Sequence, residues 1–484
     1  MSRKSAHFKL VSSHPRTPDR GATTVKLGII VEKMKLRSLN LMALIIACSF
    51  LTGLGCQEMG HTGTEARESL SLKGMFSHEL MYPPSFPTTP KLEGADIHWV
   101  NPRLSDEGPM KLVFVSWEEI PSHVRVEVLI SGESYIAAPK FIVEGPPYGA
   151  LFEIKAVPGP GIVRARVYVG ELLMEGVELK AQRRLDMRFA TYKEVWPIER
   201  QWDESMELLY SIWVAKLFKM PKKTPGGWRP LHQVTRNRER NFLYGTMSWD
   251  EDRFKRNGPA AVTMRGDCAD VPYLLRAYFA WKMGLPVRFR QCTRGSGRRG
   301  PRCYDVNTNL MEEYAQIDDP VMRFNAFARK EIVWKVHSGT IRTLPGDEDS
   351  DLFPIDVNRR ELIPGSVFVD AGGHALVVSH VGENDLTAID GHPDMSITIR
   401  KFSQRKFFPV YTRLETGGFK AFRPIYAEKG EVHTVDNKGL GERFSKDQYG
   451  FESKNSYYSF VERRLSSDLK VSFLGLVDGR AKGH

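Results

Sequence analysis

The hydrophobic period of the chain changes near residue 190, and this change limits what the chain can fold into. From Ala95 to Lys180, apolar and polar residues alternate with a period of two, as in the segments Lys-Leu-Val-Phe-Val-Ser-Trp and Val-Arg-Val-Glu-Val-Leu-Ile. Gly/Pro-rich clusters at 144–147 and 158–161 separate these segments. Short alternating strands at this spacing predict a small β-sandwich over residues 95–183.

Beyond residue 190 the apolar residues follow a helical period. Trp202–Phe218 predicts one amphipathic helix, and a second begins near Cys268, with Gly284 as its C′ residue and Pro286 just beyond. The second helix carries an apolar stripe at i, i+3, i+4, i+7 and i+8: Val271, Leu274, Leu275, Tyr278 and Phe279. We therefore expect an α+β protein, with the β-sandwich preceding a helix-containing domain over residues 190–425 and a tail over 426–484 that wraps the surface or frays.

The net charge of +11 would be compatible with nucleic-acid binding, but most of it lies at the N-terminus. Residues 1–55 contribute +7 and leave +4 for the rest of the chain. We find no basic reading helix and no aromatic-strand motif, so the sequence disfavours a nucleic-acid partner.

The segment 34–55 has the layout of a bacterial secretory signal peptide. A basic start at Lys35 and Arg37 is followed by a short apolar stretch that ends at Gly55-Cys56. Cys after a small residue is typical of a lipidation site, which predicts a lipid anchor at Cys56, with Cys48 as the alternative. We expect residues 1–33 to be an extension or upstream read-through. The polar segment 56–94 is expected to be a disordered tether, so the chain would reach the cell envelope on the periplasmic side.

Cys268 stands at the predicted start of the second helix, after Gly266-Asp267. The unpaired N–H groups and the positive dipole end of a helix start favour the thiolate form of a cysteine. The alternative is a buried, inert cysteine, because free Cys is among the most buried residues. A nearby base would favour the nucleophile.

A predicted hairpin supplies such a base. With its turn centred on Gly382, Leu376 faces Ala388 and His374 faces Asp390, so both polar side chains lie on one face. A carboxylate in this position holds the imidazole in one tautomer and stabilises its cation. The sequence thus predicts a Cys268–His374–Asp390 triad, with His392 as a rival base.

The chain order Cys, His, Asp, with Cys at a helix start and the others on neighbouring strands, resembles the transglutaminase-like branch of the papain-like cysteine hydrolases. The stretch Gly266–Val287 is similar to the nucleophile helix of that branch, and Pro-Gly-Ser-Val followed by Gly-His-Ala-Leu-Val-Val is similar to NlpC-type and CHAP-type cell-wall amidases. The resemblance implies a nucleophile helix packed on an antiparallel sheet, with Cys268 as nucleophile, His374 as base and Asp390 as orienter. Papain has a Gln just upstream of its catalytic cysteine, but no Gln stands just upstream of Cys268. This leaves the backbone N–H of Cys268 as oxyanion donor.

Two further cysteines, Cys292 and Cys303, bracket the loop 293–302. In an exported protein such a pair predicts a disulfide, and no metal or other cofactor is expected. Six arginines lie within residues 288–302. Arg294, Arg298 and Arg299 are candidates for binding an anionic substrate, and the alternative is that the loop is simply solvated. The acidic segment Asp347–Asp351 lacks the Gly and the terminal Glu of a calcium loop.

Together these features predict an exported cysteine hydrolase that cleaves amide bonds of envelope peptides or peptidoglycan through an acyl-enzyme. Two alternatives remain open: a transglutaminase-type acyl transferase that cross-links proteins, and an inactive binding or scaffold lipoprotein. For the β-sandwich we expect an immunoglobulin-like spacer or docking module, with sugar or protein binding as the alternative.

Overall fold

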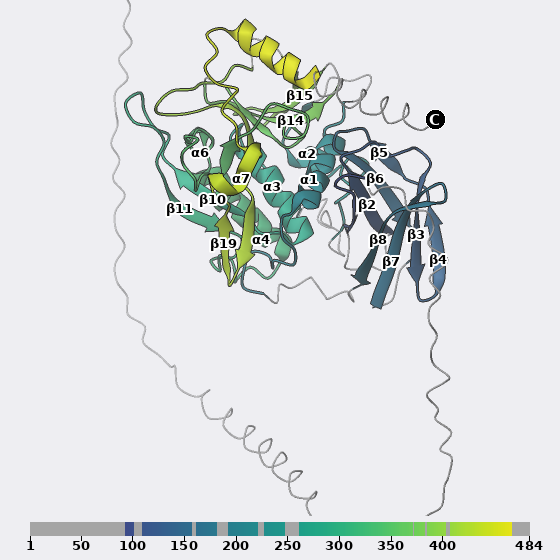
Figure 1. The fold of residues 1–484 in the computed structure, drawn as a ribbon. Coiled ribbons are helices and arrows are strands. Elements are labelled where there is room, and N and C mark those ends of the chain that lie inside the picture. The colour runs from purple at the N-terminus through teal and green to yellow at the C-terminus, as the bar shows by residue number, and fades with distance from the viewer. Residues whose placement is uncertain are drawn as a thin grey trace, which may run out of the picture. The chain divides into compact units, whose positions relative to one another are not determined.

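The computed structural model describes residues 92–100, 109–156, 161–181, 192–220, 227–246, 261–370, 372–382, 385–402 and 407–466. Within these ranges the chain combines helices with antiparallel sheets (Figure 1). The predicted α+β class is therefore confirmed. The predicted extension, the signal peptide and the lipidation candidates Cys48 and Cys56 lie outside the described residues.

The period-two region forms two four-stranded antiparallel sheets. The first has the order β1 (Asp96–Trp99), β2 (Met110–Ser116), β6 (Tyr148–Ile154) and β5 (Phe141–Val143). The second has the order β4 (Glu133–Ala137), β3 (Val124–Ile130), β7 (Gly161–Val169) and β8 (Leu172–Ala181). Apolar side chains of both sheets share one core, which includes Phe114 and Phe152 from the first and Val126 and Val167 from the second.

The first of these sheets is buried on both faces. Val113 and Leu151 point away from the shared core and belong to a second cluster that contains helix α1 (Glu204–Leu217). Gly149 permits this packing, because a Cβ there would lie 2.7 Å from the Ile212 side chain. Burial of both faces explains the nearly continuous apolar run of β2, in which alternation is weak.

A seven-stranded antiparallel sheet forms the centre of the remaining structure. Its order is β12 (Leu352–Pro354), β17 (Gly418–Phe422), β13 (Val367–Val369), β14 (Ala375–Val381), β15 (Leu386–Gly391), β16 (Ile397–Lys401) and β9 (Gly227–Trp228). Side chains alternate between two cores: Val367 and Val377 pack with α1 and α3 (Asp270–Met283), whereas Phe368 and Leu376 pack on the other face.

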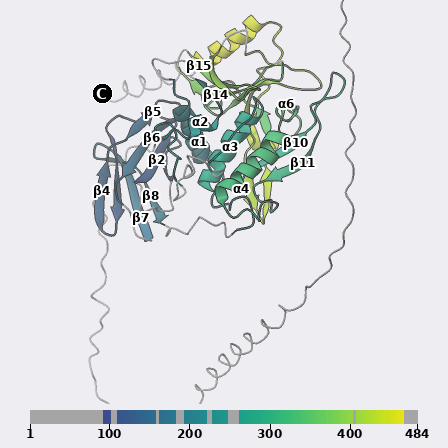
Figure 2. The ribbon, with the colours of Figure 1, turned by 180° about the vertical axis from the view of Figure 1, so that it is seen from behind.

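Helix α3 is buried on all sides, which exceeds the single buried stripe that the sequence predicts. Trp213 of α1 stacks on Tyr278, and Phe324 of α4 (Pro320–Phe327) stacks on Trp281, so α3 lies between two helices (Figure 2). Its polar Arg276 is satisfied by both carboxylate oxygens of Glu207. Gly284 ends the helix in the left-handed conformation at φ 67°, as the sequence predicts.

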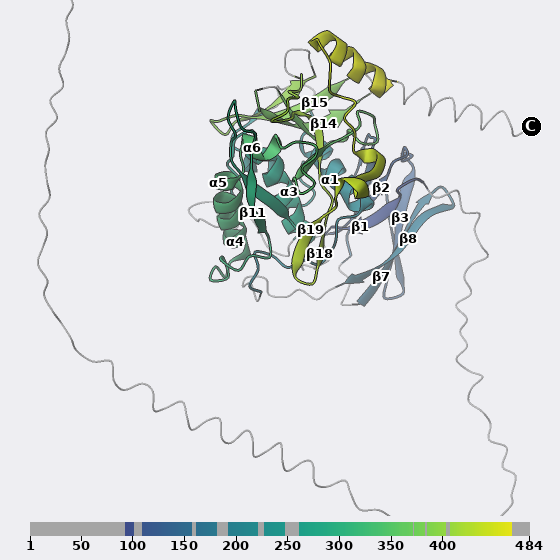
Figure 3. The ribbon, with the colours of Figure 1, turned by 60° about the vertical axis from the view of Figure 1, so that its left-hand side comes forward.

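The C-terminal region differs from the predicted surface tail. A helix over 454–466 covers the second face of the large sheet beside β14 and β15 (Figure 3), and its Tyr457, Val461 and Leu465 are buried in the same core as Phe368. Polar residues stand among the apolar residues of the segment 454–466, and the sequence analysis did not single it out as a buried helix. The hairpin of β18 (Ile425–Glu428) and β19 (Glu431–Thr434) and the short helix α7 (Asn437–Leu440) complete this region.

The smaller elements connect these layers. The hairpin of β10 (Arg288–Cys292) and β11 (Cys303–Thr308) follows α3 directly. The others are α2 (His232–Thr235), η2 (Ala328–Ile332), α5 (Val333–Lys335), α6 (Ser338–Ile341) and η3 (Gly441–Arg443).

Candidate active site

Cys268 lies in the turn that leads into α3, two residues before the first helical residue, Asp270. The Asp267 carboxylate accepts a hydrogen bond from Ala269 N at 2.9 Å, and the Asp267 carbonyl accepts one from Val271 N at 3.2 Å. Asp270 reciprocates by accepting from Asp267 N at 2.9 Å. Cys268 is a free cysteine and is partly exposed, so its thiol is accessible from solvent.

The second carboxyl group of this cap has an unusual environment. Asp270 is 3% exposed, and burial, followed by the negative charge of Asp267, raises the pKa of Asp270 to about 8. Near neutral pH the helix start therefore carries fewer negative charges than its two carboxyl groups suggest. Sequence analysis missed this, because burial of a first-turn Asp has no signature in the sequence.

His374 and Asp390 are hydrogen-bonded, with 2.5 Å between His374 Nε2 and Asp390 Oδ1. The predicted register is wrong by two residues: Leu376 pairs with Asp390 and Val378 with Ala388. The turn lies between Val381 and Leu386, so its centre falls after Gly382, and a bulge interrupts the pairing after Val378. A shift of two preserves the face on which each side chain lies, so His374 reaches Asp390 diagonally.

The imidazole of His374 interacts with a carboxylate and with a thiol. The hydrogen bond to Asp390, and then the hydrogen bond to the Cys268 thiol, raise the pKa of His374 to about 10, although burial opposes this. Since Asp390 occupies Nε2, the ring nitrogen that remains for the thiol is Nδ1. The structure thus brings the three predicted residues together, with His374 hydrogen-bonded to Asp390 and interacting with Cys268.

Asp390 has two further neighbours that were not predicted as its partners. Arg400 on β16 donates from Nε to Asp390 Oδ2 at 2.7 Å. His392 lies 3.9 Å from the same oxygen and is hydrogen-bonded to Thr398 Oγ1. Burial alone would raise the pKa of Asp390, but the hydrogen bonds from His374 and Arg400 outweigh it and lower the pKa to about 2.

A glycine allows the strand and the helix to meet. A Cβ on Gly391, the residue after Asp390, would lie 3.2 Å from Cys268 Cα and 2.9 Å from Val271 Cγ2. The absence of a side chain therefore lets the end of β15 approach the start of α3. Sequence analysis did not single out Gly391, although a Gly directly after the predicted orienter is a visible signal.

The arginine-rich hairpin after α3 contains two kinds of arginine. Cys292 and Cys303 face each other across β10 and β11 and form a disulfide. The three candidate substrate-binding residues Arg294, Arg298 and Arg299 are exposed, and in the described part of the chain no carboxylate pairs with them.

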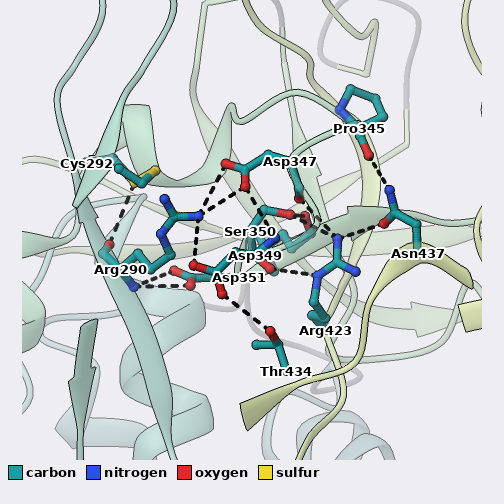
Figure 4. Close-up of polar contacts among 12 residues, drawn as sticks. Arg290, Cys292, Pro345, Asp347, Asp349, Ser350, Asp351, Arg423, Thr434 and Asn437 are labelled. Carbon is teal, nitrogen blue, oxygen red and sulfur yellow. Dashed lines mark hydrogen bonds and ion pairs between the residues drawn. A yellow bond between two sulfur atoms is a disulfide. The ribbon is translucent and has the colours of Figure 1, made fainter. Parts of the chain in front are cut away.

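Arg288 and Arg290, in contrast, bind the acidic segment Asp347–Asp351 (Figure 4). Arg290 Nη1 lies 3.1 Å from Asp347 Oδ1, and Arg290 N donates to both carboxylate oxygens of Asp351. Burial raises the pKa of Asp351 to about 7. This acidic segment therefore serves to anchor the hairpin.

In the residues that the structure describes, no group of three or more His, Cys, Asp or Glu side chains is placed to hold a metal ion. No helix among these residues combines the length and the apolar character needed to cross a bilayer.

Comparison with models of protein families, with curated proteins and with solved structures gave no match. The geometry of Cys268, His374 and Asp390 is therefore the evidence for the chemistry of the site.

Proposed function

We propose that the protein is a cysteine hydrolase of the transglutaminase-like branch of the papain-like fold, with Cys268, His374 and Asp390 as its catalytic triad. The observation that carries the proposal is the imidazole of His374, which is hydrogen-bonded to Asp390 and is close enough to Cys268 for the thiol to contribute to its raised pKa. The same arrangement, in which a third group orients the base, is typical of activated nucleophiles.

In the proposed reaction, the Cys268 thiolate attacks an amide carbonyl and forms a tetrahedral intermediate. The protonated His374 then donates its proton to the leaving amine, the C–N bond breaks, and a thioester to Cys268 remains. Neutral His374 next takes a proton from water, the resulting hydroxide attacks the thioester, and the carboxylic acid leaves while the proton returns to the Cys268–His374 pair. Asp390 holds the imidazole in orientation throughout.

The oxyanion of the tetrahedral intermediate needs at least one donor. The backbone N–H of Cys268 has no acceptor among the described residues, so it is available for this role. Its position just before the first turn of α3 also places the developing charge near the positive end of the helix dipole.

For the substrate we propose amide bonds of envelope peptides, including those of peptidoglycan. This proposal rests on the secretion signal at 34–55 and the lipidation candidate Cys56, which together would place the protein, lipid-anchored, on the periplasmic side of the envelope. The two-sheet sandwich would then be an immunoglobulin-like module that supports the catalytic part. Its close packing on α1 favours support over an independent binding role.

The first experiment tests the nucleophile by alkylating the full-length protein with iodoacetamide at about pH 6 and mapping the modified peptide. An ordinary thiol is only about 0.3% ionised at that pH, so fast alkylation indicates a thiolate–imidazolium pair. We expect Cys268 to react quickly and to slow by at least about tenfold in His374→Gln. The matched control His380→Gln changes an exposed imidazole on the same hairpin and should leave the rate unchanged.

The second experiment tests the activity. Purified peptidoglycan and a protein substrate with an added amine are incubated with the wild type and with Cys268→Ser, and the products are analysed by mass spectrometry. Release of new carboxylates supports hydrolysis, whereas amine incorporation would replace it with acyl transfer. A scaffold role would be indicated if Cys268 reacted no faster than an ordinary thiol and neither product formed.

A further inference from the structure

The hairpin that follows α3 presents positive charge that the described residues do not neutralise. Of its arginines, the two at the base are bound by Asp347 and Asp349. Those in the loop and at the start of β11 are exposed and have no carboxylate partner in the described ranges: Arg294, Arg298, Arg299 and Arg302.

Arg294 is the member of this group whose main chain is fixed close to the triad. Its carbonyl accepts a hydrogen bond from Arg342 Nη2 at 2.9 Å. The side chain of Arg342 in turn lies against Gly373, with Nε 3.0 Å from where a Cβ would stand, and Gly373 directly precedes His374. A single side chain therefore separates the backbone of Arg294 from that of the proposed base.

A second tight contact holds the same part of the loop. Gly339 at the start of α6 lies so close that a Cβ there would meet the carbonyl of Thr293 at 2.1 Å and Arg294 Cα at 3.0 Å. The backbone of Arg294 is thus held between α6 and Arg342, while its side chain is exposed. A fixed backbone with a free guanidinium is suited to binding a ligand.

The charge of Arg294 also acts on the start of α3. It lowers the pKa of Asp270, against the larger effect of burial, and after burial it is the next cause that lowers the pKa of His337. Asp270 lies two residues after Cys268, so the guanidinium acts on the segment of chain that carries the thiol. Arg342 does not add to the free charge, because it is paired with Glu415.

We propose that Arg294 binds a carboxylate of the substrate next to the scissile amide, so that the enzyme selects acidic acyl groups. This inference rests on the proposed function and adds a substrate class to it. A guanidinium binds a carboxylate through two parallel hydrogen bonds, which fixes the orientation of the substrate as well as its charge. Such a contact orients the adjacent carbonyl towards Cys268.

The test compares two alkylating probes of nearly equal size on the full-length protein. Iodoacetate carries a carboxylate and iodoacetamide does not, and both modify Cys268. We expect Arg294→Gln to lower the iodoacetate rate by about tenfold, the loss expected for a charge-assisted hydrogen bond, and to change the iodoacetamide rate by less than about twofold. Arg302→Gln is the matched control, because Arg302 is also exposed but is not one of the three candidate substrate-binding residues.

The outcomes separate the inference from the function on which it rests. A selective loss of iodoacetate reactivity in Arg294→Gln supports the carboxylate site. Equal rates in the wild type and Arg294→Gln, an equal loss with both probes, or the same loss in Arg302→Gln would overturn it. If wild-type Cys268 reacts with iodoacetamide no faster than an ordinary thiol, the proposed hydrolase itself is wrong.

Discussion

The substitution Asp390→Asn tests the electrostatic basis of the site most directly. It replaces a buried carboxylate, 1% exposed, with a neutral group of nearly the same shape. Asp390 is the largest cause of the raised pKa of His374, which stands at about 10 against an ordinary value of 6.5. Without this carboxylate we expect the pKa of His374 to return towards its ordinary value.

The size of the effect follows from these two values. At about pH 8, a histidine with a pKa of about 10 is about 99% protonated, whereas one with a pKa of about 6.5 is about 3% protonated. A full return to 6.5 would reduce the protonated fraction of His374 about thirtyfold at that pH, and the remaining interaction with Cys268 makes the expected reduction smaller. Proton donation to the leaving amine should fall in proportion.

Histidine NMR measures this without a substrate. The imidazole signals of the full-length protein are followed from about pH 5 to about pH 10.5, and the His374 signal is assigned by its loss in His374→Gln. In the wild type the His374 signal should titrate only near the top of this range, and in Asp390→Asn it should titrate closer to pH ~6.5.

The control for this experiment is Asp385→Asn on the same hairpin. Asp385 lies 3.3 Å from His380, and both are exposed, so only the His380 signal should respond. Wild-type His374 titrating near its ordinary value would refute the reasoning, as would an Asp390→Asn titration identical to that of the wild type.

Three further predictions concern stability. Gly391→Ala should destabilise the protein by about 1–3 kcal/mol, because its Cβ would press on Cys268 Cα, whereas Gly297→Ala, with no atom within 4 Å, should have little effect; urea unfolding compares them. Cys292→Ser should cost about 3 kcal/mol, since the bond to Cys303 closes a loop with a sequence separation of 11; an unchanged urea midpoint would contradict this. The His374–Asp390 pair should stabilise the fold fully between about pH 4 and pH 6.5. This stabilisation should be lost as the pH rises through about 10, the raised pKa of His374, and as the pH falls through about 2, the lowered pKa of Asp390. Urea midpoints of the wild type and His374→Gln across this range should show the difference.

Local patterns were sufficient for most secondary structure. The period-two segments became the strands of the two four-stranded sheets, and the helical stripes became α1 and α3. The C-terminal helix was missed although Tyr457, Val461 and Leu465 stand at the helical spacing i, i+4 and i+8. Their burial depends on the face of the large sheet that this helix covers.

The meeting of the site residues depended on parity more than on register. The hairpin register was predicted two residues away from the observed one, yet His374 and Asp390 still met, because an even shift keeps side chains on the same face. An odd shift would have placed them on opposite faces. Helix capping by Asp267 is local as well, so the position of Cys268 at a helix start could be read from the chain.

The sequence by itself thus determined the strands of the two four-stranded sheets, the helices α1 and α3, and the three residues of the proposed triad, because periodicity and strand parity are local properties. Only the tertiary structure decided which charges remain free. Arg288 and Arg290 are neutralised by an acidic segment about sixty residues later, Asp390 gains Arg400 from the next strand, and Arg294 remains without a carboxylate partner in the described ranges. Ion pairs form between side chains that folding brings within a few ångströms, and the distance along the chain does not predict that separation.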